Sequence, residues 1–406
     1  MNLKLDEKQG NIPFIIGFTG HRDLRTEDLN SLKSSVTTVL NEIKETIPNT
    51  PIIVLSALAE GADRLCAQVA IECGASLYVP CPLPIEDYSK DFTTEQSKEE
   101  FYSLLAQADY YFEIPLDQCF NWEEKNYSTY RDYCYEQLSM YLTNTCQVLI
   151  ALWDGVDNIS PGGTAATVKL KLDSKSTYQS QNTILLNTQN PGQVTIINTP
   201  RDSNPNPMEN PFSIRQCFSK IKESDNDSEQ DFLNIIKRIN MFNKDVKRYK
   251  SKLSTKIANS KEAVLPGFEL HNLSHLNTML DVYAAADQVS LYFQKLRLLF
   301  LRLLLGMGVV LVTLFLLYDE LEANIMLPLY LFFFIFTFIC YFVAKKREYH
   351  TKYIDYRALA EGLKVQIYWN LAGLSSNVVE HYLWSQKSEL SWIRNGVSNC
   401  YLQKKN

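Results

Sequence analysis

The first two hundred residues alternate short apolar runs with longer amphipathic segments. The apolar runs at 13–18, 51–55, 76–79, 110–112, 148–153 and 193–198 predict strands, and the segments at 26–47, 63–73, 97–108, 131–142 and 164–172 predict helices. Strands that are apolar throughout belong to sheets covered on both faces, and intervening helices make such sheets mostly parallel. The pattern therefore predicts a doubly wound, Rossmann-like α/β domain over residues 1–200.

The composition changes after this domain. Residues 204–211 read NPNPMENP, and neither Pro nor Asn sustains a regular ladder, so we expect a linker over 201–228. A helical connector is expected over 229–297. Within it, apolar residues recur at three- and four-residue intervals, as on one face of a helix: Leu276, Leu280, Tyr283, Ala286 and Val289.

Two apolar stretches follow, and only residues 319–323 (DELEA) separate them. The first is 303–318, which 298–301 extends beyond Arg302, and the second is 324–344. A helix of roughly 17–25 residues crosses a bilayer core, so 298–344 predicts a two-helix transmembrane hairpin. The alternative is a pair of buried core helices, but helices that are apolar on every side rarely suit a soluble core.

Charged residues flank this hairpin asymmetrically. The outer ends carry Arg297, Arg302, Lys345, Lys346 and Arg347, whereas the connecting loop carries Asp319, Glu320 and Glu322. Because basic residues concentrate on the cytoplasmic side of a membrane, both termini are expected in the cytoplasm. Residues 345–406, with helical patterns at 347–370 and 376–394, would then form cytosolic C-terminal helices.

Charge and cysteine content narrow the class of protein. The formal net charge of −6 argues against nucleic acid as a partner, because nucleic-acid binders carry a basic excess or stripe. The 9 cysteines include no CxxC pair and no Cys/His quartet, so we expect reduced thiols and no metal site. Residues 1–11 are polar and predict no secretory signal peptide.

The first candidate binding segment follows the first predicted strand and reads GFTGHR. It contains Gly17, Thr19, Gly20, His21 and Arg22. A glycine-bearing turn between a strand and a helix brings backbone N–H groups close to phosphate oxygens, and the last two side chains add hydrogen bonds and charge. The alternative is a tight turn with a solvated arginine.

The second candidate segment, SALAEGADR, follows the second strand. It contains Ser56, Glu60, Gly61, Asp63 and Arg64. Its small residues permit close approach of a ligand, and its two carboxylates can accept hydrogen bonds from ribose hydroxyls. Capping of the next helix is an equally good explanation for Asp63.

The third candidate segment joins LWDG to SPGGTA. It contains Asp154, Gly155, Gly162, Gly163 and Thr164. A Gly-Gly-Thr sequence at the start of a helix presents free N–H groups and the positive end of the helix dipole, which suits a phosphate. Because all three segments follow buried strands, we expect them to converge at one sheet edge as a nucleotide pocket.

The ordered set GFTGHR, SALAEGADR, PLPIEDYSKDF, Tyr130-Arg131, ALWDG and PGGTA resembles the SLOG superfamily, a Rossmannoid group related to DprA and Lonely Guy proteins. The resemblance covers roughly residues 12–200. The hairpin followed by YRALAEGLKVQIYW and SELSWIR looks like a SLATT two-helix effector module. Arg131 matches the family pattern and, with Arg22 and Arg64, is a candidate phosphate partner.

This resemblance implies a bacterial anti-phage defence protein in the inner membrane. The SLOG-like domain would sense a nucleotide second messenger, such as a cyclic oligonucleotide or a cyclic ADP-ribose-type molecule, supplied by a neighbouring messenger-producing enzyme. The SLATT-like module would then disrupt the membrane, leading to abortive infection. Since two helices cannot enclose a pore, conduction would require a homo-oligomer.

The alternative is a membrane-anchored nucleotide-processing enzyme. Lonely Guy phosphoribohydrolases resemble this fold and use a PGGxGTxxE motif whose Glu takes part in catalysis. Here Ala165 and Ala166 replace the second Gly-Thr, and Lys169 stands at the Glu position. Because a cation cannot act as a carboxylate acid or base, we assign no catalytic residue and expect no cofactor beyond the nucleotide ligand.

Overall fold

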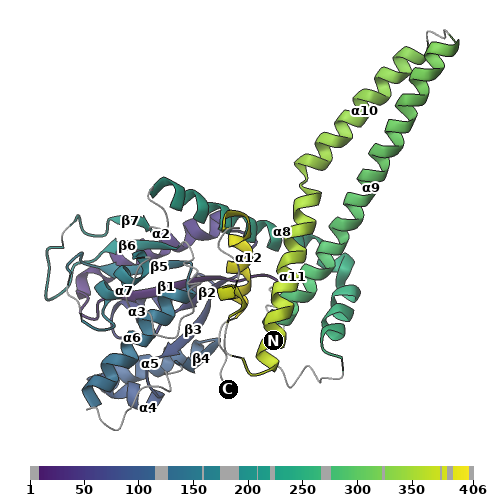
Figure 1. The fold of residues 1–406 in the computed structure, drawn as a ribbon. Helices are drawn as coiled ribbons and strands as arrows, with labels where there is room; N and C mark the ends of the chain where they lie inside the picture. The colour runs from purple at the N-terminus through teal and green to yellow at the C-terminus, as the bar shows by residue number, and fades with distance from the viewer. Residues whose placement is uncertain are drawn as a thin grey trace. The chain divides into compact units, whose positions relative to one another are not determined.

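The computed structural model describes residues 9–114, 127–157, 160–173, 192–207, 209–219, 225–266, 276–321, 325–374, 377–381 and 387–401. The chain divides into two compact units. Asn11–Lys244 and Ser375–Asn406 form the α/β unit, and Met1–Gly10 and Asp245–Leu374 form the helical unit. Figure 1 shows the sheet of the first unit and the long helices of the second.

The α/β unit is built on a sheet whose described strands have the order β4-β3-β2-β1-β5-β6-β7. They are β1 (Phe14–Gly20), β2 (Ile52–Leu55), β3 (Ser76–Cys81), β4 (Tyr110–Glu113), β5 (Val148–Trp153), β6 (Gln193–Asn198) and β7 (Ile214–Phe218). All neighbours are parallel except β6 and β7, which are antiparallel. The chain moves outward from β1 in one direction through β4 and returns to the other side of β1 with β5. This reversal is a topological switch point between β1 and β5.

Helices cover both faces of this sheet, as the apolar strands predict (Figure 1). On one face, Phe14, Ile16 and Phe18 of β1 pack in a core with α2 (Leu29–Thr46), α3 (Ala62–Glu72) and α5 (Glu95–Gln107). On the other face, Ile15 packs in a core with α6 (Tyr127–Thr145) and α7 (Thr164–Leu172). The doubly wound α/β prediction is therefore confirmed.

The structure differs from the expected linker over 201–228. Residues 214–218 form β7, which pairs with β6 and extends the sheet, and α8 (Asp225–Val264) begins before residue 228. Ile214 pairs with Ile197 through the backbone, which places β7 at the edge of the sheet. The Pro- and Asn-rich residues before it gave no sequence indication of a strand. The irregular part of this segment is the loop between β6 and β7.

The C-terminal residues also differ from the prediction of one helix at 376–394 in the membrane module. The described residues form a short 3₁₀ turn (Val378–His381) and α12 (Lys387–Cys400), and both belong to the α/β unit. Asn399 of α12 donates to the carbonyl of Pro13 at 2.8 Å and accepts from Gln147 at 2.5 Å. Because these residues precede β1 and β5, α12 covers the amino ends of the strands.

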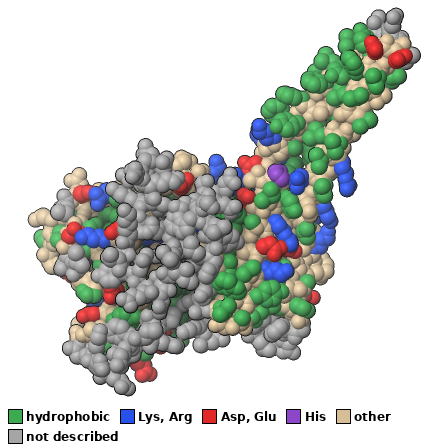
Figure 2. All heavy atoms as spheres, in the orientation of Figure 1, with side chains coloured by type: hydrophobic (Ala, Val, Ile, Leu, Met, Phe, Trp, Pro, Cys, Tyr) green, Lys and Arg blue, Asp and Glu red, His purple; other side chains and the backbone are tan. Residues whose placement is uncertain are grey.

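The helical unit contains the end of α8 with α9 (Asn277–Leu321), α10 (Met326–Lys346) and α11 (Tyr349–Leu371). Two of its helices are long and apolar enough to cross a membrane, as predicted. Figure 2 shows hydrophobic side chains gathered over α9 and α10. Few of these side chains are buried in the protein, so a nonpolar solvent such as a bilayer is the surrounding they fit.

Ion pairs, of which Lys352–Asp245 is largely buried and Arg357–Asp287 is half-exposed, join the helices next to the apolar hairpin. Asp245 of α8 accepts from Lys352 at 2.7 Å and from Tyr356 at 2.8 Å, both on α11. Asp287 of α9 accepts from Ser260 of α8 at 2.8 Å and from Arg357 of α11 at 2.5 Å. Since charges buried in pairs are costly to separate, these contacts tie α8, α9 and α11 to one another.

Candidate functional site

A cavity of about 390 Å³ opens at the carboxyl ends of β1 and β5, the switch point of the sheet. Ligands bind at this place in open α/β sheets. All three predicted segments contribute to its wall. The predicted residues that line it are Thr19, Gly20, His21, Arg22, Asp63, Gly162, Gly163 and Thr164.

The backbone of His21 joins the first two segments to β5. Its N–H donates to the carbonyl of Leu152 at 3.2 Å, and its carbonyl accepts from the N–H of Ala62 at 3.0 Å. Gly61 has a φ of +78°, and a Cβ there would overlap the Arg22 carbonyl. Gly20 is similarly confined, because a Cβ would meet the Ala62 side chain. Both glycines are therefore required for the chain segments to meet at this point.

The third segment places the amino end of α7 at the cavity. Gly162 has a φ of +69°, and Gly163 is the N-cap residue with no side chain to occupy the first-turn N–H groups. Thr167, one turn later, donates to the carbonyl of Gly163 at 3.0 Å and contacts the hydroxyl of Ser139 at 2.9 Å. This helix end is thus held in place while its amide groups stay available for an anion.

The charged groups at the mouth of the cavity form a connected network. His21 Nε2 lies 3.1 Å from the buried carboxylate of Asp154, which also accepts from Asn204 at 3.0 Å. Arg201 contacts Asp154 at 3.5 Å and Asp23 at 3.0 Å. Burial, followed by the charge of Arg201, lowers the pKa of His21 below its ordinary value. The imidazole is therefore neutral at pH 7, and Arg201 and the exposed Arg22 are the cations that face the cavity.

Asp63 and Tyr88 lie deeper in the same cavity. Burial raises the pKa of Asp63 to about 7, although the charge of Arg22 and a hydrogen bond from the backbone of Ala59 oppose the shift. Tyr88, the last residue of α4 (Ile85–Tyr88), is fully buried, and its hydroxyl has no hydrogen-bond partner among the described residues. The cavity thus combines two arginines and a helix amino end with a carboxyl and an unpaired phenol.

Other predicted residues lie outside the cavity wall and support it. Ser56 is fully buried and donates to the carbonyl of Asp63 at 3.0 Å. Arg64 is buried, donates to the carbonyls of Leu58 and Ser97, and stacks over the Phe92 ring. Gly17 packs against Cys146, and Glu60 accepts a hydrogen bond from Ser97. The other predicted residues outside the wall are Asp154, described above, and the two turn glycines Gly61 and Gly155.

Arg131 lines a separate, neighbouring hollow of about 370 Å³ together with Arg22 and Tyr135. Its guanidinium pairs with Asp91, which also accepts from the hydroxyl of Tyr135. The structure therefore brings Arg22 to the switch-point cavity but gives Arg64 and Arg131 protein partners. Lys169 points to Asp157, with 3.0 Å between Nζ and Oδ2, and does not line the cavity.

Several cavity residues were missed by sequence reasoning. They are Asp23, Tyr88, Tyr135, Ser139 and Arg201. Tyr88 lies within PLPIEDYSKDF, which carries part of the family resemblance, and so had a usable signal. The sequence around Arg201 gave no such signal, because this segment follows β6 and reaches the site only through the pairing of β6 with β5.

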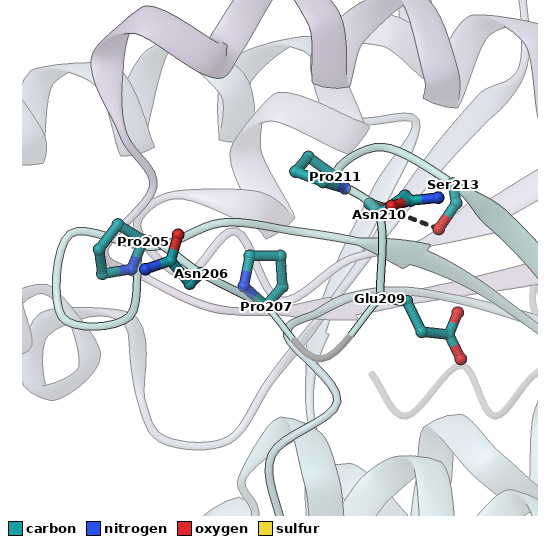
Figure 3. Close-up of a pocket in the computed structure, with 7 residues that line it drawn as sticks. All are labelled: Pro205, Asn206, Pro207, Glu209, Asn210, Pro211 and Ser213. Atoms are coloured by element: carbon teal, nitrogen blue, oxygen red, sulfur yellow. Dashed lines mark hydrogen bonds between the residues drawn. The ribbon is translucent and has the colours of Figure 1, made fainter.

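A further hollow of about 630 Å³ lies over the loop between β6 and β7 (Figure 3). Its wall is mostly Pro and Asn, with Glu209 as its charged residue. Ser213 donates to the carbonyl of Asn210 at 2.7 Å and closes a local turn. A wall of this kind offers an anion neither a cation nor a helix end, so the switch-point cavity is the better candidate site.

Among the described residues, no group of three or more His, Cys, Asp or Glu side chains could hold a metal ion. No protein-family model matches the chain, and no curated protein matches it. Among solved structures, the chain is similar to DNA processing protein A (DprA) from Streptococcus pneumoniae, with 14% sequence identity and a TM-score of 0.23. The match covers 34% of this chain and 41% of the DprA chain. A likeness of this size says nothing about function, and the fold class rests on the sheet and helices described above.

Proposed function

We propose that this protein is a membrane effector gated by a nucleotide. A nucleotide second messenger, of the cyclic oligonucleotide or cyclic ADP-ribose type, binds at the switch-point cavity. Binding favours a homo-oligomer whose apolar hairpins disrupt the bacterial inner membrane and cause abortive infection during phage attack. A neighbouring enzyme supplies the messenger.

The observation that carries the binding half of this proposal is the composition of the cavity. The amino end of α7 provides amide groups for phosphate oxygens, and the side chain of Arg22 provides positive charge. Arg201 also lines the cavity, but its charge is shared with Asp23 and Asp154. Asp63 provides an acceptor for a sugar hydroxyl. A volume of about 390 Å³ lies within the range of small-ligand pockets.

The apolar helices α9 and α10 support the membrane half. Their exposed side chains include Leu305, Val309, Phe332 and Phe338, each more than half exposed. Exposed Lys345 and Lys346 lie in the last turn of α10 and Arg347 follows it, whereas Asp319 and Glu320 lie in the last turn of α9. This asymmetry favours cytoplasmic termini, because positive charge is retained on the cytoplasmic side. A cytoplasmic α/β unit would have access to a soluble messenger.

Binding is favoured over catalysis at this site. In the hydrolase motif a Glu stands where this chain has Lys169, and Lys169 is paired with Asp157 away from the cavity. Asp63 is the one observation that favours the enzyme alternative, because a carboxyl with a pKa of about 7 can take and release a proton at neutral pH. Nucleotide hydrolysis that disappears in Asp63→Asn would support that second function.

Ligand binding by the purified full-length protein in nanodiscs tests the proposal. Cyclic dinucleotides, cyclic trinucleotides and cyclic ADP-ribose isomers are screened by thermal shift, and liposomes report dye leakage. We expect one class to raise the melting temperature and to trigger leakage. Gly163→Asp should abolish both effects, because an aspartate caps α7 and places negative charge where a phosphate would bind. A Cβ at this position would overlap the Ser160 hydroxyl oxygen, so that side chain must shift, and the melting temperature of the unliganded variant checks that it folds. Absence of any stabilising nucleotide would overturn the proposal.

A further inference from the structure

The hydroxyl of Tyr88 is buried beside the cavity without a hydrogen-bond partner among the described residues. The side chain is 0% exposed, and its ring packs edge-on against Phe92 and Phe101, with centroids 5.2 and 5.7 Å away. The aromatic packing therefore holds the phenol in one position. A buried polar group left unpaired destabilises a fold, so a rigidly held one in a cavity wall indicates a ligand atom as its partner.

The polar groups Tyr135, Asp63 and Arg22 interact electrostatically with this hydroxyl. Burial raises the pKa of Tyr88 well above its ordinary value, and Tyr135 and Asp63 raise it further, while Arg22 lowers it. Tyr88 is consequently a neutral phenol that can donate one hydrogen bond. Asp63 offers oxygens that accept, and Arg22 balances its charge. Donor and acceptor thus stand together at this end of the cavity.

We propose that Tyr88 and Asp63 bind a ribose hydroxyl, so that the site selects ribonucleotides over their deoxy analogues. The inference rests on the proposed nucleotide function and names the ligand class more narrowly. The hydroxyl accepts from Tyr88 and donates to Asp63. Tyr88 is a specificity-determining residue in this arrangement, because a site built to hydrogen-bond a hydroxyl rejects a ligand that lacks it.

A phosphate fits this end of the cavity less well. Phosphate oxygens only accept hydrogen bonds, so Asp63 would face like charge when ionised and would lose its partner. The amino end of α7 provides a better place for the phosphate elsewhere in the same wall. The two ends of the cavity therefore orient a nucleotide, with its sugar at Tyr88 and its phosphate at α7.

Binding of ADP, 2′-deoxy-ADP and 3′-deoxy-ADP to the full-length protein in nanodiscs tests the inference. In the wild-type protein, we expect at least one deoxy analogue to bind tenfold or more weakly than ADP. In Tyr88→Phe, ADP should bind more weakly than to the wild type, by a factor no larger than the deoxy penalty because the contact with Asp63 remains, and the analogue should be unaffected. The melting temperature of the unliganded variant should stay the same or rise, since the substitution removes an unpaired polar atom. Tyr141→Phe is the matched control, because that phenol is also buried but packs on Phe112 outside the cavity.

Three results would overturn the inference. Tyr88→Phe could bind ADP as tightly as the wild type, or it could weaken ADP and both analogues by one common factor, as a phosphate contact would. ADP could also fail to bind at millimolar concentration. Comparison with Gly163→Asp distinguishes failure of this inference from failure of the proposed nucleotide binding. Nucleotide binding that is lost in Gly163→Asp but kept in Tyr88→Phe leaves the sensor standing and removes only the ribose contact.

Discussion

His21 at the end of β1 lies against Asp154 at the end of β5, with 3.1 Å between Nε2 and Oδ1. The contact crosses the switch point of the sheet, so it joins the two strands between which the cavity opens. Asp154 is 1% exposed and also accepts from Asn204 and from the N–H of Val156. The carboxylate thus organises three chain segments at the cavity mouth. Burial would raise the pKa of Asp154, but these hydrogen bonds and His21 lower it, so the group is ionised at neutral pH.

Asp154→Ala should destabilise the α/β unit. The substitution leaves the Asn204 amide and the Val156 N–H without their acceptor, and the loss should be about 2 kcal/mol. For a unit of this size that corresponds to a fall of roughly 4–8 °C in melting temperature. Differential scanning fluorimetry on the purified protein measures it. Asp157→Ala is the control, because its contact with Lys169 is exposed and worth little. Equal effects of the two variants would contradict this assignment.

Asp63 should make stability fall as the pH rises. Burial raises its pKa from 3.8 to about 7, so between these values the folded protein keeps a proton that the unfolded chain releases. Stability from this group is therefore greatest at low pH and is lost as the pH passes through about 7. Asp63→Asn cannot ionise and should melt higher than the wild type at pH 8, with the two converging near pH 4. A difference that does not change between pH 4 and pH 8 would show that folding does not raise the pKa of Asp63.

Arg22 and Arg64 should respond oppositely to replacement by lysine. Arg64 is 3% exposed and makes hydrogen bonds from Nε to Leu58 and from Nη1 to Ser97, which a single ammonium cannot reproduce. Arg64→Lys should lower the melting temperature but leave the nucleotide affinity of the folded fraction unchanged.

Arg22→Lys should change affinity instead. Arg22 is an exposed residue that lines the cavity, so we expect little effect on melting temperature and a loss in affinity of about tenfold, or roughly 1.4 kcal/mol. Isothermal titration with the nucleotide identified in the screen measures this loss. A stability defect in Arg22→Lys together with normal affinity would reverse the roles of the two arginines.

A lysine in the middle of either apolar helix should impair membrane insertion. Val312 and Phe338 are 60% and 57% exposed on α9 and α10. A lysine near the centre of a membrane helix costs about 2.5–3.5 kcal/mol on insertion scales. Val312→Lys and Phe338→Lys should therefore reduce the fraction that resists alkaline extraction from membranes. Leu233→Lys is the control, because Leu233 is 40% exposed on α8, outside the apolar hairpin. Extraction of all three variants to the same extent would contradict a spanning hairpin.

Much of the fold could be predicted because its strands are short apolar runs. Placing the ends of β1, β2 and β5 at one edge also predicted that Gly20, Asp63 and Gly163 would lie in one cavity wall. It was harder to predict which side chains at that edge are accessible to a ligand. Arg22 and Arg64 both follow parallel strands in small-residue segments, and only the packing of Arg64 over the Phe92 ring distinguishes a structural arginine from an accessible one.

The features that the sequence did not predict depend on contacts between residues far apart in the chain. Arg201 reaches the cavity because β6 pairs with β5, and no local pattern near residue 201 records that pairing. β7 was hidden for a similar reason, since a five-residue edge strand after a Pro-rich loop has little periodicity to detect. The unpaired hydroxyl of Tyr88 is likewise a property of packing, because its sequence neighbours do not reveal what surrounds the phenol.

One arm of the apolar hairpin is a continuous helix and the other is interrupted. α9 is one helix of 45 residues, roughly 70 Å long, whereas its partner arm breaks at Arg347–Glu348, where Glu348 has a φ of +54° before α11 begins. A bilayer core of ~30 Å can hold less than half of α9. The remainder of α9 lies outside such a core and is held to α8 and α11 through Asp287. Because α9 is continuous, a shift of α8 or α11 against it would reach the apolar hairpin through an unbroken backbone, whereas the other arm changes direction at Glu348.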